Sequence, residues 1–156
     1  MYEIKIINEI KKFGKPITVE DYIKLCLYGP NGYYKKSKVL GREGDFTTAP
    51  EISQLFGEII GLFILNEWNT FIKKKFNLIE LGPGSGTLIL DILRITKKFD
   101  NFQKSMQLNL IDKNISLKKR QKTLLSKISL SNKIKWSENF KAFDNKPSII
   151  IANEFF

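Results

Sequence analysis

The sequence predicts an α/β fold, in which helices pack on a parallel sheet and a helical region precedes that sheet. Short apolar segments alternate with helical segments from Phe76 onward, and hydrophobic residues recur at helical spacing before that point. Hydrophobic residues make up 42% of the 156 residues, which is enough for one globular core but not for two large domains. We therefore divide the chain into a helical N-terminal region, residues 1–75, and a sheet-forming region, residues 76–156.

Two helices are expected at the N-terminus. Isoleucines at positions 4, 7 and 10 share one helical face, and Gly14 and Pro16 end that helix. Thr18 and Asp21 are spaced like a capping box, which predicts the start of a second helix. Cys26 falls on the apolar face of that second helix and is expected to be a small core residue.

A long loop is expected over residues 29–50, because this stretch holds four glycines and two prolines. Long loops in compact domains are often functional, so one interpretation is a lid in which Asp45, Thr47, Thr48 and Glu51 face a cofactor and an acceptor. The alternative is a network of turns in which Thr48 or Ser53 caps the next helix. That helix is predicted from Glu51 to about Lys74, with a buried side made of Ile52, Leu55, Phe56, Ile59, Ile60, Phe63 and Trp68.

The sheet-forming region alternates strands with helices, which is typical of right-handed βαβ units. Ligands in such sheets bind at the carboxyl ends of the strands. The predicted strands are 76–81, 108–112, 133–136 and 148–152, and the predicted helices are 87–97 and 115–128.

A glycine-rich turn follows the first of these strands. Gly82, Gly84 and Gly86 lie between the strand and the next helix, and Glu80 precedes the first glycine by two residues. Glycines allow a ligand to approach the backbone closely, and the helix N-terminus offers free N–H groups. The spacing differs from the dinucleotide fingerprint and resembles the first motif of class I methyltransferases, which implies a loop that cradles S-adenosylmethionine. The alternative is a purely structural turn.

Polar residues also follow the second and fourth strands. Asp112 can accept hydrogen bonds from both ribose hydroxyls of a nucleotide, or it can cap the next helix. Asn153 and Glu154 follow the fourth strand, where class I methyltransferases meet their acceptor, and a carboxylate there can position an attacking nitrogen. Nucleic-acid amine methyltransferases have Asn-Pro-Pro-aromatic at this point, whereas Glu154 stands here in place of the first proline.

Three segments together carry a closer resemblance. Gly44–Glu58 (GDFTTAPEISQLFGE), Glu80–Leu88 (ELGPGSGTL) and the terminal IIANEFF resemble the MidA family of class I methyltransferases, which includes the mitochondrial complex I assembly factor. The resemblance runs from about Tyr22 to the end of the chain. It implies a Rossmann-like fold, S-adenosylmethionine as cofactor and, for the mitochondrial member, methylation of an arginine on a respiratory-complex subunit. The family's histidine before its Gly-Tyr-Tyr is absent here, and Asp112 replaces a glutamate.

Composition excludes several kinds of site. The chain has no histidine and one cysteine, so we expect no metal site and no disulfide. Its net charge of +10 comes mainly from lysine, which makes up 23 of the 26 basic residues, so we interpret the charge as solvated surface and not as a nucleic-acid site. The N-terminus looks like neither a signal nor a transit peptide, so a cytoplasmic location without membrane insertion is expected.

These observations predict a methyltransferase that methylates a protein side chain. Arginine is the expected target, and the family resemblance implies a respiratory-complex subunit as substrate. Glu80, Gly82, Gly84, Gly86, Asp112 and Thr48 are the expected cofactor contacts, and Asn153, Glu154 and Glu51 the expected catalytic residues. The alternatives are a non-catalytic assembly module on the same fold and a nucleic-acid methyltransferase. Because the chain has fewer strands than the family's sheet, we expect it to be an inactive fragment that lacks the C-terminal part of the domain.

Overall fold

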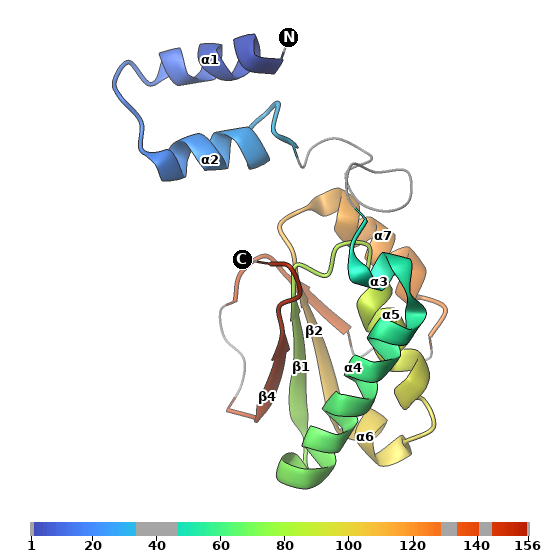
Figure 1. Ribbon diagram of the computed structural model, residues 1–156. Coiled ribbons are helices and arrows are strands. Elements are labelled where there is room, and N and C mark those ends of the chain that lie inside the picture. The colour runs from blue at the N-terminus through green and yellow to red at the C-terminus, as the bar shows by residue number, and fades with distance from the viewer. Residues whose placement is uncertain (1, 34–46, 129–133, 141–144, 156) are drawn as a thin grey trace.

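The computed structural model describes residues 2–33, 47–128, 134–140 and 145–155. Its architecture is a four-stranded parallel sheet with helices packed on it, joined to a pair of N-terminal helices (Figure 1). Asp45 and most of the predicted lid lie outside the described residues.

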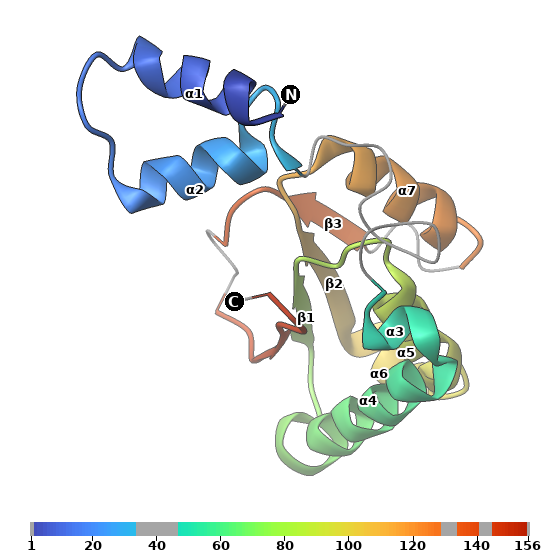
Figure 2. The ribbon, with the colours of Figure 1, turned by 45° about the horizontal axis from the view of Figure 1, so that its top comes forward.

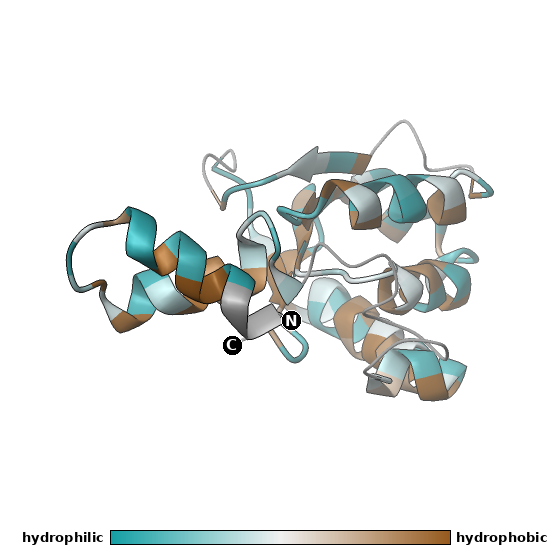
Figure 3. Cartoon of the chain, turned by 90° about the horizontal axis from the view of Figure 1, so that it is seen from above, coloured by the Kyte–Doolittle hydropathy of each residue, from teal (hydrophilic) through white to brown (hydrophobic). Residues whose placement is uncertain are grey.

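The N-terminal pair consists of α1 (Tyr2–Lys12) and α2 (Val19–Tyr28). The predicted start of α2 is confirmed, because the Thr18 hydroxyl accepts a hydrogen bond from the backbone N–H of Asp21 at 3.1 Å. Figure 3 shows this pair projecting to one side, with hydrophobic residues among the hydrophilic ones. No residue of α2 is buried, so the prediction that Cys26 belongs to a core is wrong: its side chain is only half-buried.

The single helix predicted from Glu51 to Lys74 is divided into three parts. These are α3 (Ala49–Ile52), α4 (Gln54–Glu67) and a π-helical turn, η2 (Trp68–Ile72). The break lies at Ser53, whose extended backbone (φ −140°, ψ 121°) interrupts the helix. Lys73 then ends η2 with a left-handed conformation, φ 52°.

The predicted buried side of α4 is partly wrong. Ile52, Leu55, Ile59 and Phe63 are exposed, while the buried residues are Gly57, Gly61 and Ile64. The reason is close packing against α5 (Thr87–Thr96): a Cβ at Gly57 would lie 2.6 Å from the Cβ of Asp91, and one at Gly61 would lie 2.6 Å from Cγ2 of Ile95. The face of α4 that carries Gly57 and Gly61 therefore packs against α5.

The sheet has the order β3-β2-β1-β4, and all three pairings are parallel. The strands are β1 (Phe76–Leu81), β2 (Met106–Ile111), β3 (Ile134–Ser137) and β4 (Ser148–Ile151), close to the predicted ranges. Leu78 of β1 is in register with Leu108 on one side and Ile149 on the other. Among the described strands, β4 therefore forms one edge of the sheet.

Helices α4, α5 and α7 (Ile115–Leu125) lie on the same side of the sheet in both ribbon views (Figures 1 and 2). A short helix, α6 (Asp100–Ser105), precedes β2 and was not predicted from the sequence. Its Phe102 packs between Trp68 and Phe76, with ring centroids 5.5 and 5.3 Å away. This aromatic cluster lies at the amino end of β1 and leaves the carboxyl ends of the strands free for polar groups.

None of the helices in the described parts of the chain is long and apolar enough to cross a membrane.

Candidate functional site

The turn between β1 and α5 is the centre of the candidate site. Its first residue continues the sheet, since the N–H of Gly82 donates to the carbonyl of Ile111 at 2.9 Å. Gly82, Gly84 and Gly86 all have left-handed backbone conformations, with φ of 63°, 54° and 90°. At Gly82 two features disfavour a side chain. The positive φ strains any other residue, and a Cβ would lie 2.6 Å from the Phe155 ring. The three glycines therefore allow a backbone path that other residues would adopt only with strain.

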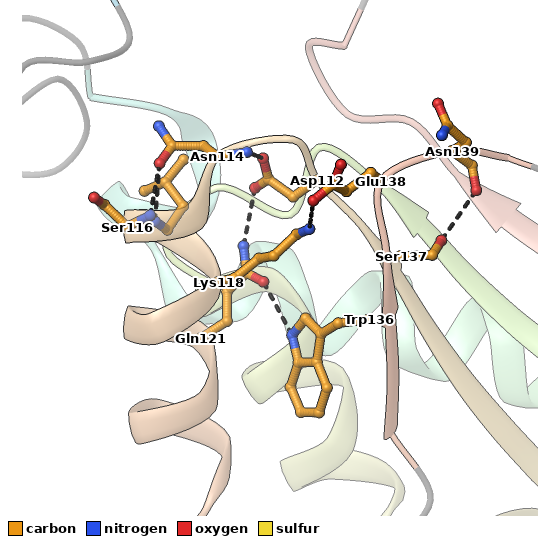
Figure 4. Close-up of polar contacts among 10 residues, drawn as sticks. Asp112, Asn114, Ser116, Lys118, Gln121, Trp136, Ser137, Glu138 and Asn139 are labelled. Carbon is orange, nitrogen blue, oxygen red and sulfur yellow. Dashed lines mark hydrogen bonds and ion pairs between the residues drawn. The ribbon is translucent and has the colours of Figure 1, made fainter.

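Asp112 lies directly beyond the carboxyl end of β2. One carboxylate oxygen accepts from the backbone N–H of Asn114 at 2.8 Å, and the other accepts from the side-chain amide of Gln121 at 3.0 Å (Figure 4). Burial raises the pKa of this carboxyl above its ordinary value. The side chain that caps α7 is not Asp112 but Asn114, which accepts from the N–H groups of Ser116 and Leu117.

Glu80 is buried inside the sheet at the start of the same site. Its Oε2 atom is fully covered and has no hydrogen-bond partner within the described residues. Burial, with the charge of Asp112 as a second cause, raises the pKa of Glu80 to about 8. A buried carboxyl oxygen without a partner costs free energy, which a hydrogen bond from a ligand or from water would offset.

Glu51 reaches the glycine turn from α3. Its Oε1 accepts hydrogen bonds from the hydroxyls of Ser85 and Thr87, the latter at 2.9 Å. These two hydroxyls are also 2.8 Å from each other. Thr48, at the N-terminal cap of α3, makes no side-chain capping bond, and neither does Ser53 at the cap of α4. The alternative interpretation is therefore confirmed in position, because both residues occupy N-cap positions, but neither side chain makes the capping hydrogen bond.

Asn153 and Glu154 form a turn after β4. Asn153 is half-buried and Glu154 is exposed, and Glu154 has a left-handed backbone conformation, φ 50°, which is uncommon outside glycine. The turn places the next residue, Phe155, against Gly82. The ends of β4 and β1 therefore meet at one place.

These groups surround a cavity of about 480 Å³. Eight of the nine predicted site residues line it: Thr48, Glu51, Glu80, Gly82, Gly84, Asp112, Asn153 and Glu154. The exception is Gly86, which caps α5 and packs against Gln121. Five of the described lining residues are acidic and only Lys113 is basic, the acids being Glu51, Glu80, Asp112, Glu138 and Glu154. The cavity is thus acidic in a chain with a net charge of +10.

Four residues of the site were not predicted: Ser85, Thr87, Gln121 and Trp136. Gln121 had a sequence signal, because it interrupts an apolar stripe on the otherwise basic helix α7, between Leu117 and Leu125. Ser85 and Thr87 lie within the glycine-rich motif but were not singled out from it, and Trp136 had no local signal. In the parts of the chain that the structure describes, no group of three acids or cysteines is placed to hold a metal ion.

Comparison with known proteins identifies the family. Residues 59–156 match a family described as S-adenosyl-L-methionine-dependent methyltransferase. The mitochondrial protein arginine methyltransferase NDUFAF7 of Bos taurus is 47% identical over 107 residues, covering 67% of this chain and 24% of the relative. The Mus musculus protein of the same name is 34% identical over 173 residues, covering 97% of this chain and 39% of the relative.

Solved structures support the fold. A protein of Burkholderia thailandensis, solved with S-adenosyl-homocysteine bound, superposes with a TM-score of 0.75 at 22% identity, covering 98% of this chain and 40% of that one. The chain thus spans less than half the length of these relatives. The fold, the cofactor type and the resemblance inferred from the sequence are confirmed, and the chain belongs to this family of S-adenosyl-L-methionine-dependent methyltransferases.

Proposed function

We propose that this chain forms the cofactor-binding part of a methyltransferase that modifies an arginine side chain of a protein. The observation that carries the proposal is the acidic cavity at the carboxyl ends of the strands. The sulfonium and ammonium groups of the cofactor and the guanidinium of the acceptor are all cations. Carboxylates around them lower the free energy of the bound state, while a polyanionic nucleic acid is repelled.

The cofactor fits the groups at one end of the cavity. In this proposal Gly82, Gly84 and Gly86 let the backbone approach it closely, and Asp112 accepts hydrogen bonds from the ribose. The unpartnered Oε2 of Glu80 gives a buried position for a hydrogen bond to the cofactor. Thr48 lines the same cavity from the start of α3 and adds a hydroxyl opposite the turn.

The acceptor is proposed to enter beside Asn153 and Glu154. When bound, the cofactor supplies an electrophilic methyl group, so that a sulfur–methyl bond breaks, a nitrogen–methyl bond forms and the nitrogen loses a proton. The Glu154 carboxylate pairs with the guanidinium and takes that proton, and the Asn153 side chain orients the nitrogen. Glu51 is the second carboxylate, and Ser85 and Thr87 hold it in place.

The two regions of the chain are proposed to have different roles. Residues 76–156 would bind the cofactor, and residues 1–75 would add a helical region with the lid over 29–50. A respiratory-complex subunit is the partner class that the family resemblance suggests, and two relatives carry the name protein arginine methyltransferase. A cytoplasmic location is proposed from the single cysteine, which suits a reducing compartment.

The test is transfer of a tritiated methyl group from the cofactor into a cell lysate by the purified chain. Label that is lost to protease and retained after RNase supports a protein acceptor, and amino-acid analysis then identifies arginine. Label lost to RNase would replace the proposal with a nucleic-acid acceptor. Cofactor binding without any transfer would contradict the proposed catalysis, in favour of the assembly module or of the inactive fragment expected from the sequence. The Glu154→Gln variant should lower transfer at least about tenfold at unchanged cofactor affinity, whereas Glu20→Gln, at an exposed carboxylate, should not.

A further inference from the structure

Gln121 is a buried amide that the proposed roles above do not use. It lies near the centre of α7 with no exposed surface, on a helix whose other polar residues are mostly exposed. Burying a primary amide costs free energy unless both its oxygen and its nitrogen find partners. The partners of this amide therefore indicate why a glutamine is accommodated here.

Three groups from three different segments contact this amide. Its Nε2 donates to the carbonyl of Gly84 at 2.9 Å and to Asp112 at 3.0 Å. Its Oε1 accepts from the indole N–H of Trp136 on β3 at 3.1 Å. Figure 4 shows Gln121 between Asp112 and Trp136, with its two ends directed at them.

The chemistry of these partners permits only one orientation of the amide. An indole N–H is a donor only, so it requires the oxygen of Gln121. A carbonyl and a carboxylate are acceptors, so both require the nitrogen. Turning the amide over would set oxygen against the acceptors of Gly84 and Asp112, and would set the NH₂ group against the Trp136 donor. Trp136 therefore fixes which end of Gln121 faces the cofactor turn.

We propose that Gln121 is a positioning residue that acts through Asp112 and Gly84, and that Trp136 sets its polarity. This inference rests on the proposed function. One oxygen of Asp112 is held by the Asn114 N–H and the other by Gln121. Each oxygen keeps further lone-pair capacity, so the carboxylate meets the ribose hydroxyls in a fixed rotamer and does not have to be ordered by binding.

The test compares binding of S-adenosylhomocysteine with binding of its 2′-deoxy analogue by calorimetry. The ratio of the two affinities measures how well the protein uses a ribose hydroxyl. Gln121→Met keeps the length of the side chain and removes all three hydrogen bonds. We expect this ratio to fall about tenfold in the variant, because a carboxylate without its donor no longer holds one rotamer.

Gln103→Met is the matched control. Gln103 is also buried, and its Nε2 donates to the hydroxyl of Thr96, but it does not line the cavity. The Gln103→Met variant should be less stable, but its ratio of the two affinities should equal that of the unsubstituted chain. If Gln121→Met does not fold, Trp136→Phe, which keeps an aromatic ring but removes the indole donor, should still lower the ratio at least about threefold.

An unchanged ratio in the folded Gln121→Met or Trp136→Phe variant would overturn the positioning role, as would an equal change in Gln103→Met. If the unsubstituted chain bound neither compound, the proposed function itself would be overturned, and this inference with it.

Discussion

Replacing Glu80 with glutamine tests the electrostatics of the cavity, because glutamine keeps the shape of the protonated carboxyl and cannot ionise. The pKa of Glu80 is raised from 4.5 to about 8, first by burial and then by the charge of Asp112. The folded state therefore holds this proton more tightly than the unfolded state. The resulting contribution to stability is complete below about pH 4.5 and is lost as the pH rises through about 8.

The magnitude follows from the two pKa values. The difference between them makes ionisation in the folded state cost about 5 kcal/mol. At pH 7 the unfolded carboxyl is ionised and the folded one keeps its proton, so about 3 kcal/mol of folding free energy is lost relative to pH 4. Glutamine has no such loss. We expect Glu80→Gln and the unsubstituted chain to differ little at pH 4, and the variant to be about 3 kcal/mol more stable at pH 7.

Urea unfolding of the cofactor-free chain at pH 4 and pH 7 measures this difference. Glu20→Gln serves as the control, because Glu20 is exposed on α2 and pairs with the exposed Lys24. It should change stability little at either pH. A Glu80→Gln variant that is less stable at pH 7, or whose difference from the unsubstituted chain is the same at both pH values, would refute the reasoning.

Three further substitutions have defined outcomes. Gly84→Val should abolish most cofactor binding in calorimetry, because valine is strained at φ 54°; equal affinities in folded proteins would contradict this. Asp112→Ala should weaken cofactor binding about tenfold to a thousandfold, from two charge-assisted bonds of roughly 1.5–3 kcal/mol each; a loss under about threefold would limit Asp112 to its structural bonds with Asn114 and Gln121. Gly61→Ala should cost about 1–3 kcal/mol of unfolding free energy, because its Cβ would lie 2.6 Å from Ile95; a neutral result would mean that α4 shifts easily.

The strands and the glycine turn were predictable because their signals are local. Six apolar or buried residues followed by three glycines define β1 and the turn, and the predicted bounds of β1 agree with the structure. The carboxyl ends of parallel strands meet at one edge, so Glu80, Asp112 and Asn153 could be expected together from topology alone. The structure places all three around one cavity.

The packing of α4 was not predictable from hydrophobic spacing. This helix is apolar on most of its surface, so periodicity does not single out one buried face. The face against α5 is selected by Gly57 and Gly61, where the absence of a Cβ allows close approach. Helix α6 was missed for the opposite reason, because its six residues are mostly polar and only Phe102 and Gln103 are buried.

The hydrogen bonds of the site join residues too far apart for any local pattern. Glu51 lies 34 residues from Ser85, and Gln121 lies 37 from Gly84. Side-chain contacts at such separations depend on how α3 and α7 pack beside the sheet, and that information is spread over the whole chain. The sequence signal of such a contact is a polar residue on an otherwise apolar helix face, as at Gln121.

The glycine turn is held from two sides by these distant contacts. Glu51 of α3 binds the hydroxyls of Ser85 and Thr87, and Gln121 of α7 binds the carbonyl of Gly84. A turn rich in glycine loses much conformational entropy when it is fixed, so without such contacts a ligand would have to order it on binding. Because folding already orders this turn, the cost is moved from ligand binding to the stability of the domain. Substitutions of Glu51 or Gln121 should therefore weaken ligand binding more than their direct contacts with the ligand would explain.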